Sequence, residues 1–161
     1  RLTRLMRISD IAVGTRMPSW VAEGVEEYSR RMPRGVKLQW REIPLARRVP
    51  GAKAEQLSER ESEQLLKAIP PGDTVIALDV LGKRISTAQL AQQLEAWQML
   101  WVIYSLLICV PVGISTRCLE RASARWSLSD LTLPHPLVRV ILAEQLYRAW
   151  TITVNHPYHR E

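Results

Sequence analysis

The chain has 161 residues, of which 47% are hydrophobic and 24% are charged. These values argue against disorder and suit one ordinary domain, so we expect a single domain over residues 1–161. The formal net charge is +6 and the pI is about 9.8. This basic balance points either to an acidic polymer such as RNA or DNA as a partner or to a basic protein without one.

The two cysteines, Cys109 and Cys118, are too few for a disulfide framework or a four-ligand metal site, so we expect buried thiols. His156 and His159 are three residues apart. Pro157 prevents a regular helix between them and no acidic or cysteine partner is nearby, so we expect no metal.

An uncharged stretch of the chain tests for a membrane span. Its strongly apolar part, Met99–Val110, is shorter than the roughly 20 residues that a spanning helix needs, and a Pro and a Gly follow it. The basic N-terminus lacks the apolar region of a secretory signal. We therefore expect a cytoplasmic protein without a membrane segment.

The first half of the chain alternates predicted strands and helices. The predicted elements are a strand at Met6–Val13, a helix that opens at Pro18 and Ser19 and has Arg30 and Arg31 at its C-terminal end, a half-exposed strand at Val36–Ile43 and an exposed helix at Ala54–Ala68. Trp20, Val21, Val25 and Tyr28 fall on one face of the first helix, which indicates packing against a core.

The second half continues the alternation. Its predicted elements are a buried strand at Thr74–Leu78, a turn at Gly82, a helix from Ser86 to about Trp97, a buried strand at Tyr104–Val110, a helix from Ser115 or Thr116 to about Arg125, a short strand at Leu131–Leu133, a helix at Leu137–Thr153 and an irregular tail from Asn155. Ser86 and Gln89 form a capping-box pattern. Together these elements predict an α/β fold with a mainly parallel sheet flanked by helices.

Ligands of such folds bind beyond the carboxyl ends of the strands. The segment Ser127–Leu133 alternates hydroxyl side chains with leucines. It is either a site where backbone groups and an apolar wall receive an adenine, or an ordinary loop whose leucines cap the core. Dinucleotide, P-loop and serine-hydrolase glycine motifs are absent from the sequence.

Basic residues cluster in one region of the chain. They are Arg30, Arg31, Arg34, Lys37, Arg41, Arg47, Arg48 and Lys53. The cluster is either a phosphate-binding surface or a solvated basic face. Trp20, Trp40 and Tyr158 are aromatic residues that either stack on bases or pack in the core.

The C-terminal stretch "WSLSDLTLPHPLVRVILAEQLYRAWTITVNHPYHRE" resembles the signature of one family. So do "IAVGTRMPSWVAEGVEEYSRRMP" near the start and "VIALDVLGKRISTAQLAQQLEAW" in the middle. The family is the bacterial 23S ribosomal RNA pseudouridine N3-methyltransferases of the SPOUT class, and the resemblance covers nearly the whole chain from about Met6.

The resemblance implies a SPOUT-type α/β fold whose C-terminal part is tied in a deep trefoil knot, an exception to unknotted topology. It implies S-adenosylmethionine as the cofactor, held in that knot. It also implies a homodimer in which each site is completed by the partner subunit. The implied substrate is a pseudouridine in a stem-loop of 23S rRNA in assembled ribosomes.

The resemblance further assigns site residues by position. Those implied to contact the cofactor are Leu78, Cys109, Gly113, Leu128, Ser129, Asp130, Leu131, Thr132 and Leu133. Those implied to lie by the RNA are Arg148, Tyr158, His159 and Arg160. His159 is our candidate for the base or orienting group, and the two arginines would stabilise the imide anion that develops at N3.

The chain departs from the family after its fourth predicted strand, where members carry Gly-Gly-Pro-Glu-Gly. Cys109, Val110, Pro111, Val112 and Gly113 occupy these positions. Larger side chains here would take space where the cofactor approaches. The chain is therefore either a working methyltransferase whose loop tolerates the changes or a fold-intact homodimeric RNA-binding variant with impaired cofactor binding.

Overall fold

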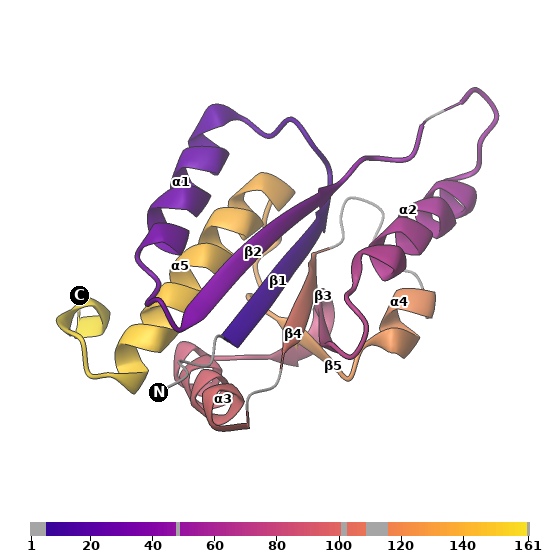
Figure 1. Ribbon diagram of the computed structural model, residues 1–161. Coiled ribbons are helices and arrows are strands. Elements are labelled where there is room, and N and C mark those ends of the chain that lie inside the picture. Colours follow the sequence, from indigo (N-terminus) through magenta and orange to yellow (C-terminus); the bar gives the residue numbers. More distant parts are fainter. Residues whose placement is uncertain (1–5, 48, 101–102, 109–115, 161) are drawn as a thin grey trace.

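The computed structural model describes residues 6–47, 49–100, 103–108 and 116–160. A five-stranded parallel sheet forms its centre, with strand order β2-β1-β4-β3-β5 (Figure 1). The elements in chain order are β1 (Met6–Val13), α1 (Ser19–Arg30), β2 (Val36–Ile43), α2 (Ala54–Ala68), β3 (Thr74–Arg84), α3 (Thr87–Leu100), β4 (Tyr104–Ile108), α4 (Thr116–Arg121), β5 (Ala124–Ser127), α5 (His135–Thr153) and the 3₁₀ turn η1 (Pro157–Arg160).

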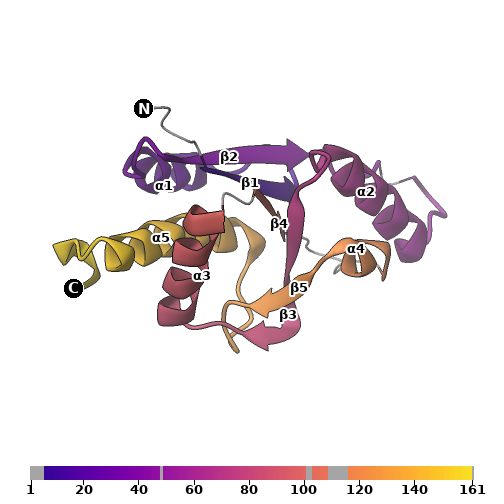
Figure 2. The same cartoon turned by 60° about the horizontal axis from the view of Figure 1, so that its bottom comes forward.

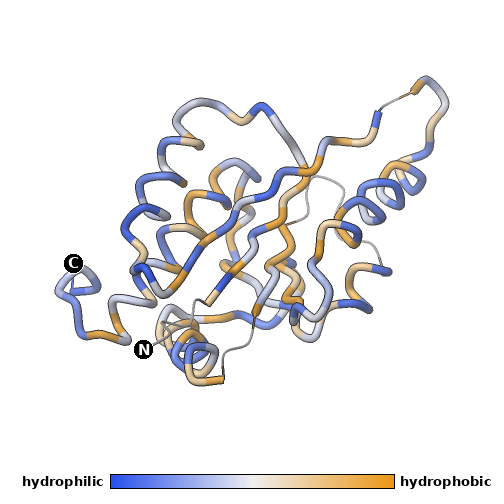
Figure 3. Tube along the Cα trace, in the orientation of Figure 1, coloured by the Kyte–Doolittle hydropathy of each residue, from blue (hydrophilic) through white to orange (hydrophobic). Residues whose placement is uncertain are grey.

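Helices cover both faces of the sheet, with α1, α3 and α5 on one face and α2 and α4 on the other (Figure 2). Alternation along β1 serves both layers, because Ile8 and Ala12 pack toward α3 and α5 whereas Ile11 and Val13 pack toward α2 and α4. Apolar residues accordingly follow the central strands, while α2 is largely hydrophilic (Figure 3). The α/β class with a parallel sheet is confirmed.

The first four elements lie where the sequence predicts them, and β1, β2 and α2 have the predicted bounds. The capping box is also confirmed: the Gln89 amide donates to the Ser86 hydroxyl (3.1 Å), and the Ser86 amide donates to Gln89 Oε1 (2.8 Å). The placement of Trp20 on the packed face of α1 is wrong, because its side chain is 51% exposed and Val21 provides the buried contact.

Two predictions around β3 and β5 are wrong. Gly82 lies within β3, which continues to Arg84, and does not mark a turn. The last strand is formed by Ala124–Ser127, and residues Leu131–Leu133 form no strand. Both errors have one physical reason: β3 bends through a register shift between Leu78 and Lys83 and then pairs with β5 a second time.

Two helix ends and the tail also differ from the prediction. α3 extends three residues past Trp97 to Leu100, and α4 ends at Arg121 instead of about Arg125. α4 is short because the Ser123 amide donates to the Val75 carbonyl (2.8 Å), which starts the pairing of β5 with β3. The tail predicted to be irregular contains η1, entered through Asn155 at φ 55°.

Cys118 is fully buried, as predicted, whereas Cys109 lies outside the described residues. Within the described ranges, no helix has both the length and the apolar character needed to cross a bilayer. The same ranges contain no cluster of three or more His, Cys, Asp or Glu residues arranged to hold a metal ion.

Candidate functional site

The candidate site has two parts, and the first lies around Leu78 of β3 and the carboxyl end of β5. Leu78 is 8% exposed and pairs in register with Ile108 on one side and Trp126 on the other. Trp126 stacks on Trp97 of α3 with a centroid distance of 5.9 Å, and Trp97 stacks on Tyr104 at 3.8 Å. This aromatic column fixes where β5 ends and where the segment Leu128–Leu133 begins.

Hydrogen bonds within the segment shape its backbone. The Ser127 hydroxyl donates to the Ser129 carbonyl (3.0 Å), and the Leu131 amide donates to the Ser129 hydroxyl (2.9 Å). Asp130 is exposed and pairs with Arg84 at 2.7 Å. Because both serine hydroxyls serve the turn, the segment offers main-chain groups and leucine side chains to a ligand.

The residues of this segment differ in exposure. Leu128 is half-buried against the core, Leu131 is 73% exposed, and Thr132 is exposed too. Leu128 also lines a pocket of about 430 Å³ between α3 and α5, whose other lining residues are Ile85, Ser86, Thr87, Leu90, Ile141 and Gln145. Cys109 and Gly113, the other two predicted cofactor contacts, lie outside the described residues.

The second part is the C-terminal end of α5 together with η1. Glu144 Oε1 accepts hydrogen bonds from Arg148 Nε (2.7 Å) and from the Tyr158 hydroxyl (3.1 Å). The Arg148 guanidinium lies over the Tyr158 ring at 4.8 Å, and that ring meets Tyr147 edge-on at 4.7 Å. The structure thus brings Arg148 and Tyr158 together; that they lie by the RNA stays a prediction.

Burial and neighbouring groups shift the pKa values of Tyr158 and Arg148 in this second part. Burial, a hydrogen bond with Tyr28 and the Glu144 charge raise the pKa of the Tyr158 hydroxyl well above its usual value. The hydrogen bond to Glu144 raises the pKa of Arg148, which stays charged. His159 is half-buried, and its Nδ1 has no hydrogen-bond partner among the described residues; Arg160 is exposed.

Among the described residues, the pocket that contains Leu128 and the second part of the site are separate. None of Arg148, Tyr158, His159 and Arg160 lines the pocket that contains Leu128. α5 starts next to the segment Leu128–Leu133 and runs away from it toward the C-terminus (Figure 1). At 1.5 Å per residue, Arg148 lies about 20 Å along the helix axis from His135. Sequence reasoning also missed Glu144, although its i,i+4 spacing from Arg148 was a usable signal.

A buried arginine anchors the start of α5. Arg139 is 4% exposed, and its guanidinium donates to Glu42 (2.6 Å), to the Gly14 carbonyl (2.7 Å) and, through Nε, to His135 Nε2 (2.8 Å). Burial and the positive charge of Arg139 lower the pKa of His135 to about 4. Neutral His135 can therefore accept this bond, and the clamp holds the helix that follows the Leu128–Leu133 segment.

Of the basic cluster, Arg34, Lys37, Arg41, Arg47 and Lys53 are exposed, and Arg48 lies outside the described residues. Arg30 and Arg31 both pair with Glu27. Among the aromatic residues predicted either to stack on bases or to pack, Trp40 packs against the core, and its Nε1 donates to Ser29 at 3.0 Å. These exposed cations lie just before β2, within it and in the loop after it.

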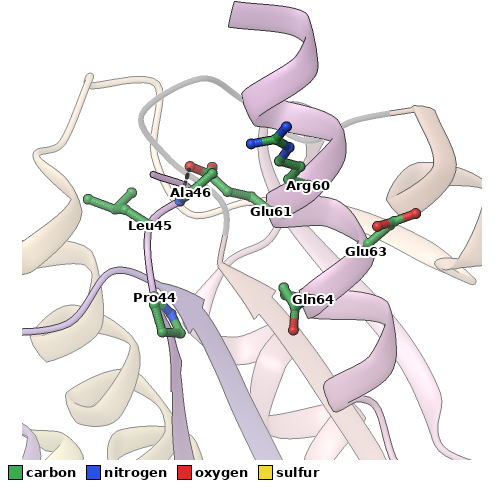
Figure 4. A pocket seen from close by; sticks show the side chains of 7 residues that line it. All are labelled: Pro44, Leu45, Ala46, Arg60, Glu61, Glu63 and Gln64. Carbon is green, nitrogen blue, oxygen red and sulfur yellow. Dashed lines mark hydrogen bonds between the residues drawn. The ribbon is translucent and has the colours of Figure 1, made fainter. Parts of the chain in front are cut away.

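A separate pocket of about 310 Å³ opens beside that loop, between the end of β2 and α2 (Figure 4). Glu61 is 8% exposed and accepts a hydrogen bond from the Ala46 amide at 3.2 Å. Glu61 therefore holds the start of the loop between β2 and α2, residues 44–53, against α2. None of the predicted site residues lines this pocket, which places it outside the candidate site.

Comparisons with known proteins identify the family of this chain. A family model described as "Predicted SPOUT methyltransferase" matches residues 6–159. The chain therefore belongs to the SPOUT methyltransferase family.

Two relatives are similar over almost their full length. A protein of Hahella chejuensis (strain KCTC 2396) is 55% identical over 156 residues, which cover 97% of this chain and 100% of the relative. A protein of Marinomonas sp. (strain MWYL1) is 53% identical over 155 residues, covering 96% and 100%. Both relatives are named ribosomal RNA large subunit methyltransferase H.

A solved structure shows the same fold. It is that of a probable methylase family protein from Haemophilus influenzae Rd KW20, with a TM-score of 0.55 and 12% sequence identity. The match covers 98% of this chain and 71% of that one. At this identity the likeness concerns the fold alone.

Proposed function

We propose that this protein methylates large-subunit ribosomal RNA with S-adenosylmethionine, at N3 of a pseudouridine in a stem-loop of 23S rRNA in assembled ribosomes. The observation that carries the proposal is the match of 55% identity over 97% of the chain to a relative named ribosomal RNA large subunit methyltransferase H. A ribosomal substrate would place the protein in the cytoplasm. The exposed cations along β2 suit an RNA phosphate backbone.

The residues around Leu78 of β3 and the carboxyl end of β5 fit the cofactor. Leu78 and Leu128 offer an apolar wall, and the segment after Ser127 presents main-chain groups because its serine hydroxyls are used internally. An adenine needs such a wall and such donors and acceptors. When bound, the cofactor supplies an electrophilic methyl group on a sulfonium. The knot that the family implies would form around this segment.

The residues of α5 and η1 would serve the RNA base. N3 of a pseudouridine carries a proton that must leave before or during methyl transfer. His159 would accept or orient this proton, since the reference pKa of histidine is about 6.5. Arg148 and Arg160 would stabilise the negative charge that develops on the imide. We infer that the second part of the site serves the first part of a partner subunit in a homodimer.

Three exposed side chains near the cofactor end support a dimer. Val80, Leu81 and Leu131 are 64%, 86% and 73% exposed. Val80 and Leu81 lie in β3 at its register shift against β5, and Leu131 follows β5. Exposed apolar groups of this kind are typical of an interaction surface. A second copy that brings α5 and η1 to this edge would cover them and complete the site.

The test is methyl transfer to ribosomes that lack the modification. Purified protein with isotope-labelled S-adenosylmethionine should label 23S rRNA, and nucleoside mass spectrometry should find the label as N3-methylpseudouridine. Calorimetric titration should show micromolar cofactor binding despite the altered Cys109–Gly113 loop. Glu59→Gln on α2 is the control variant. Absence of heat at millimolar cofactor, or label on another nucleoside, would refute the proposal.

A further inference from the structure

Glu144 is the meeting point of three hydrogen bonds on α5. Its Oε1 accepts from Arg148 Nε (2.7 Å) and the Tyr158 hydroxyl (3.1 Å), and its Oε2 accepts from Gln145 Nε2 (2.8 Å). The Glu144 side chain is only 18% exposed. A partly shielded carboxylate with three donors makes stronger bonds than the same groups would in water.

The bonds to Glu144 join α5 to η1, which the His156 amide also ties to α5 by donating to the Thr151 carbonyl (2.8 Å). α5 ends at Thr153, and Tyr158 belongs to η1 beyond the turn at Asn155. The Tyr158 hydroxyl reaches back across 14 residues to Glu144. The ring of Tyr158 is then enclosed between the Arg148 guanidinium and Tyr147. The bond from Arg148 to Glu144 uses Nε, one of the five N–H donors of its guanidinium.

The network also extends toward the cofactor end of the same subunit. The Thr87 hydroxyl donates to Gln145 Oε1 at 2.7 Å, and Gln145 donates to Glu144. Thr87 and Gln145 line the pocket that contains Leu128. A continuous series of side chains therefore connects the wall of that pocket with Arg148 and Tyr158.

We propose that Glu144 is a positioning residue for methyl transfer, which holds η1 against α5 and sets Arg148 and Tyr158 in one geometry for the RNA base. The inference rests on the proposed function for its substrate. Glu144 acts through its two partners and touches neither the base nor the cofactor. The raised pKa of the Tyr158 hydroxyl, caused by burial and by neighbours that include Glu144, agrees with this bonded arrangement.

The experiment compares wild type with Glu144→Gln, Tyr158→Phe and the double variant on ribosomes. We expect Glu144→Gln to lower kcat at least tenfold, while KM for ribosomes and the cofactor Kd change less than threefold. The double variant should lose no more activity than the worse single variant, because both changes break one unit. Glu144→Asp, which keeps the charge, should recover part of kcat.

Amide hydrogen exchange gives a readout that needs no activity. Glu144→Gln should speed exchange in residues 154–160 at least tenfold and leave β1 and β4 unchanged, whereas Glu59→Gln should change neither exchange nor kcat. If Glu144→Gln unfolds the chain, Tyr158→Phe alone must produce the same changes. Unchanged exchange, a kcat within twofold of wild type, or multiplicative losses in the double variant would overturn the proposal. Inactive wild type would refute the proposed function, and exchange would still decide whether Glu144 holds η1.

Discussion

Asp10 lies in the middle of β1, is 0% exposed and has no hydrogen-bond partner for either carboxylate oxygen among the described residues. Across the sheet it pairs with Trp40 and Leu106, which belong to the core beneath α3 and α5. Burial raises the pKa of this carboxyl well above 3.8, because an ionised carboxylate there would lose its hydration without compensation.

Because the pKa of Asp10 is raised, the free energy of unfolding depends on pH. The folded protein keeps the Asp10 proton where the unfolded chain has released it, so the free energy of unfolding falls as pH rises above 3.8 toward the folded pKa. Each pH unit in that range costs about 1.4 kcal/mol. We expect Asp10→Asn to be more stable than wild type at pH 8 and to converge with it near pH 4.

Urea unfolding between pH 4 and pH 8 measures this difference. Asp130→Asn, at an exposed carboxylate, is the control and should leave the pH dependence unchanged. A constant gap between wild type and Asp10→Asn across the whole range would show that Asp10 does not titrate in the folded state.

His135 predicts the opposite dependence. Its pKa of about 4 in the folded protein lies below 6.5, so the unfolded chain takes up a proton first as pH falls. Stability from neutral His135 is therefore present above pH 6.5 and is lost between pH 6.5 and about 4. Because the side chain is partly exposed, we expect less than about 1.4 kcal/mol per pH unit.

His135→Gln should remove this acid-dependent loss, since its amide oxygen can still accept the bond from Arg139. Urea unfolding at pH 7 and pH 4.5 separates wild type from the variant, with exposed His156→Gln as the control. If His135→Gln and wild type lost the same free energy of unfolding between pH 7 and pH 4.5, His135 would not cause the loss of stability in acid. Asp10 and His135 act in opposite directions, so each variant must be compared with wild type at every pH.

At the scale of elements, the contact between β3 and β5 depends on Gly82. A Cβ at Gly82 would lie 2.7 Å from the Arg125 carbonyl carbon, 2.8 Å from its oxygen and 2.9 Å from the Trp126 nitrogen. These are backbone atoms of β5, which cannot move without disturbing the ladder at Lys83 and Arg84. We expect Gly82→Ala to cost about 1–3 kcal/mol of stability and to weaken cofactor binding through the displaced Leu128–Leu133 segment.

Gly35→Ala is the matched control, because a Cβ at Gly35 meets no atom within 4 Å. Thermal unfolding and calorimetric titration with S-adenosylmethionine measure both effects. If Gly82→Ala were as stable as Gly35→Ala and bound the cofactor equally, the close approach of β5 to Gly82 would not hold in solution.

The same pair of strands shows what the sequence could and could not predict. Apolar runs and the Ser86–Gln89 box predicted the central strands and α3, because burial and capping leave local patterns. β5 has no such pattern: Ala124–Ser127 contains Arg125 and is defined by its pairing with β3. Gly82 has the local signature of a turn, and only the neighbouring strand shows why glycine is needed there.

The candidate site likewise has residues that the sequence could identify and contacts that it could not. The resemblance implied that Arg148 and Tyr158 both lie by the RNA, and in the structure both bond to Glu144. Their link depends on the chain folding back at η1, which residue spacing alone does not reveal. Asp10 was equally hidden, since one acid in an alternating strand looks like a half-exposed position.

At the scale of the whole molecule, the two parts of the candidate site lie at different ends of α5, and apolar side chains are exposed at the cofactor end. If each site combines two subunits, as we propose, one defect in each subunit should be compensated in a mixed dimer. Arg148→Ala would damage the RNA part. Thr132→Arg, at an exposed position in the Leu128–Leu133 segment, would damage the cofactor part without disturbing the core.

Neither variant alone should methylate ribosomes. After the two are unfolded together and refolded in equal amounts, half of the dimers are mixed, and each mixed dimer has one site with both parts intact. The mixture should therefore recover about a quarter of wild-type activity, whereas the two variants refolded separately and then combined should recover little until subunits exchange. A site built within one subunit predicts no recovery at all. The recovered fraction thus shows whether α5 and η1 serve their own subunit or the partner.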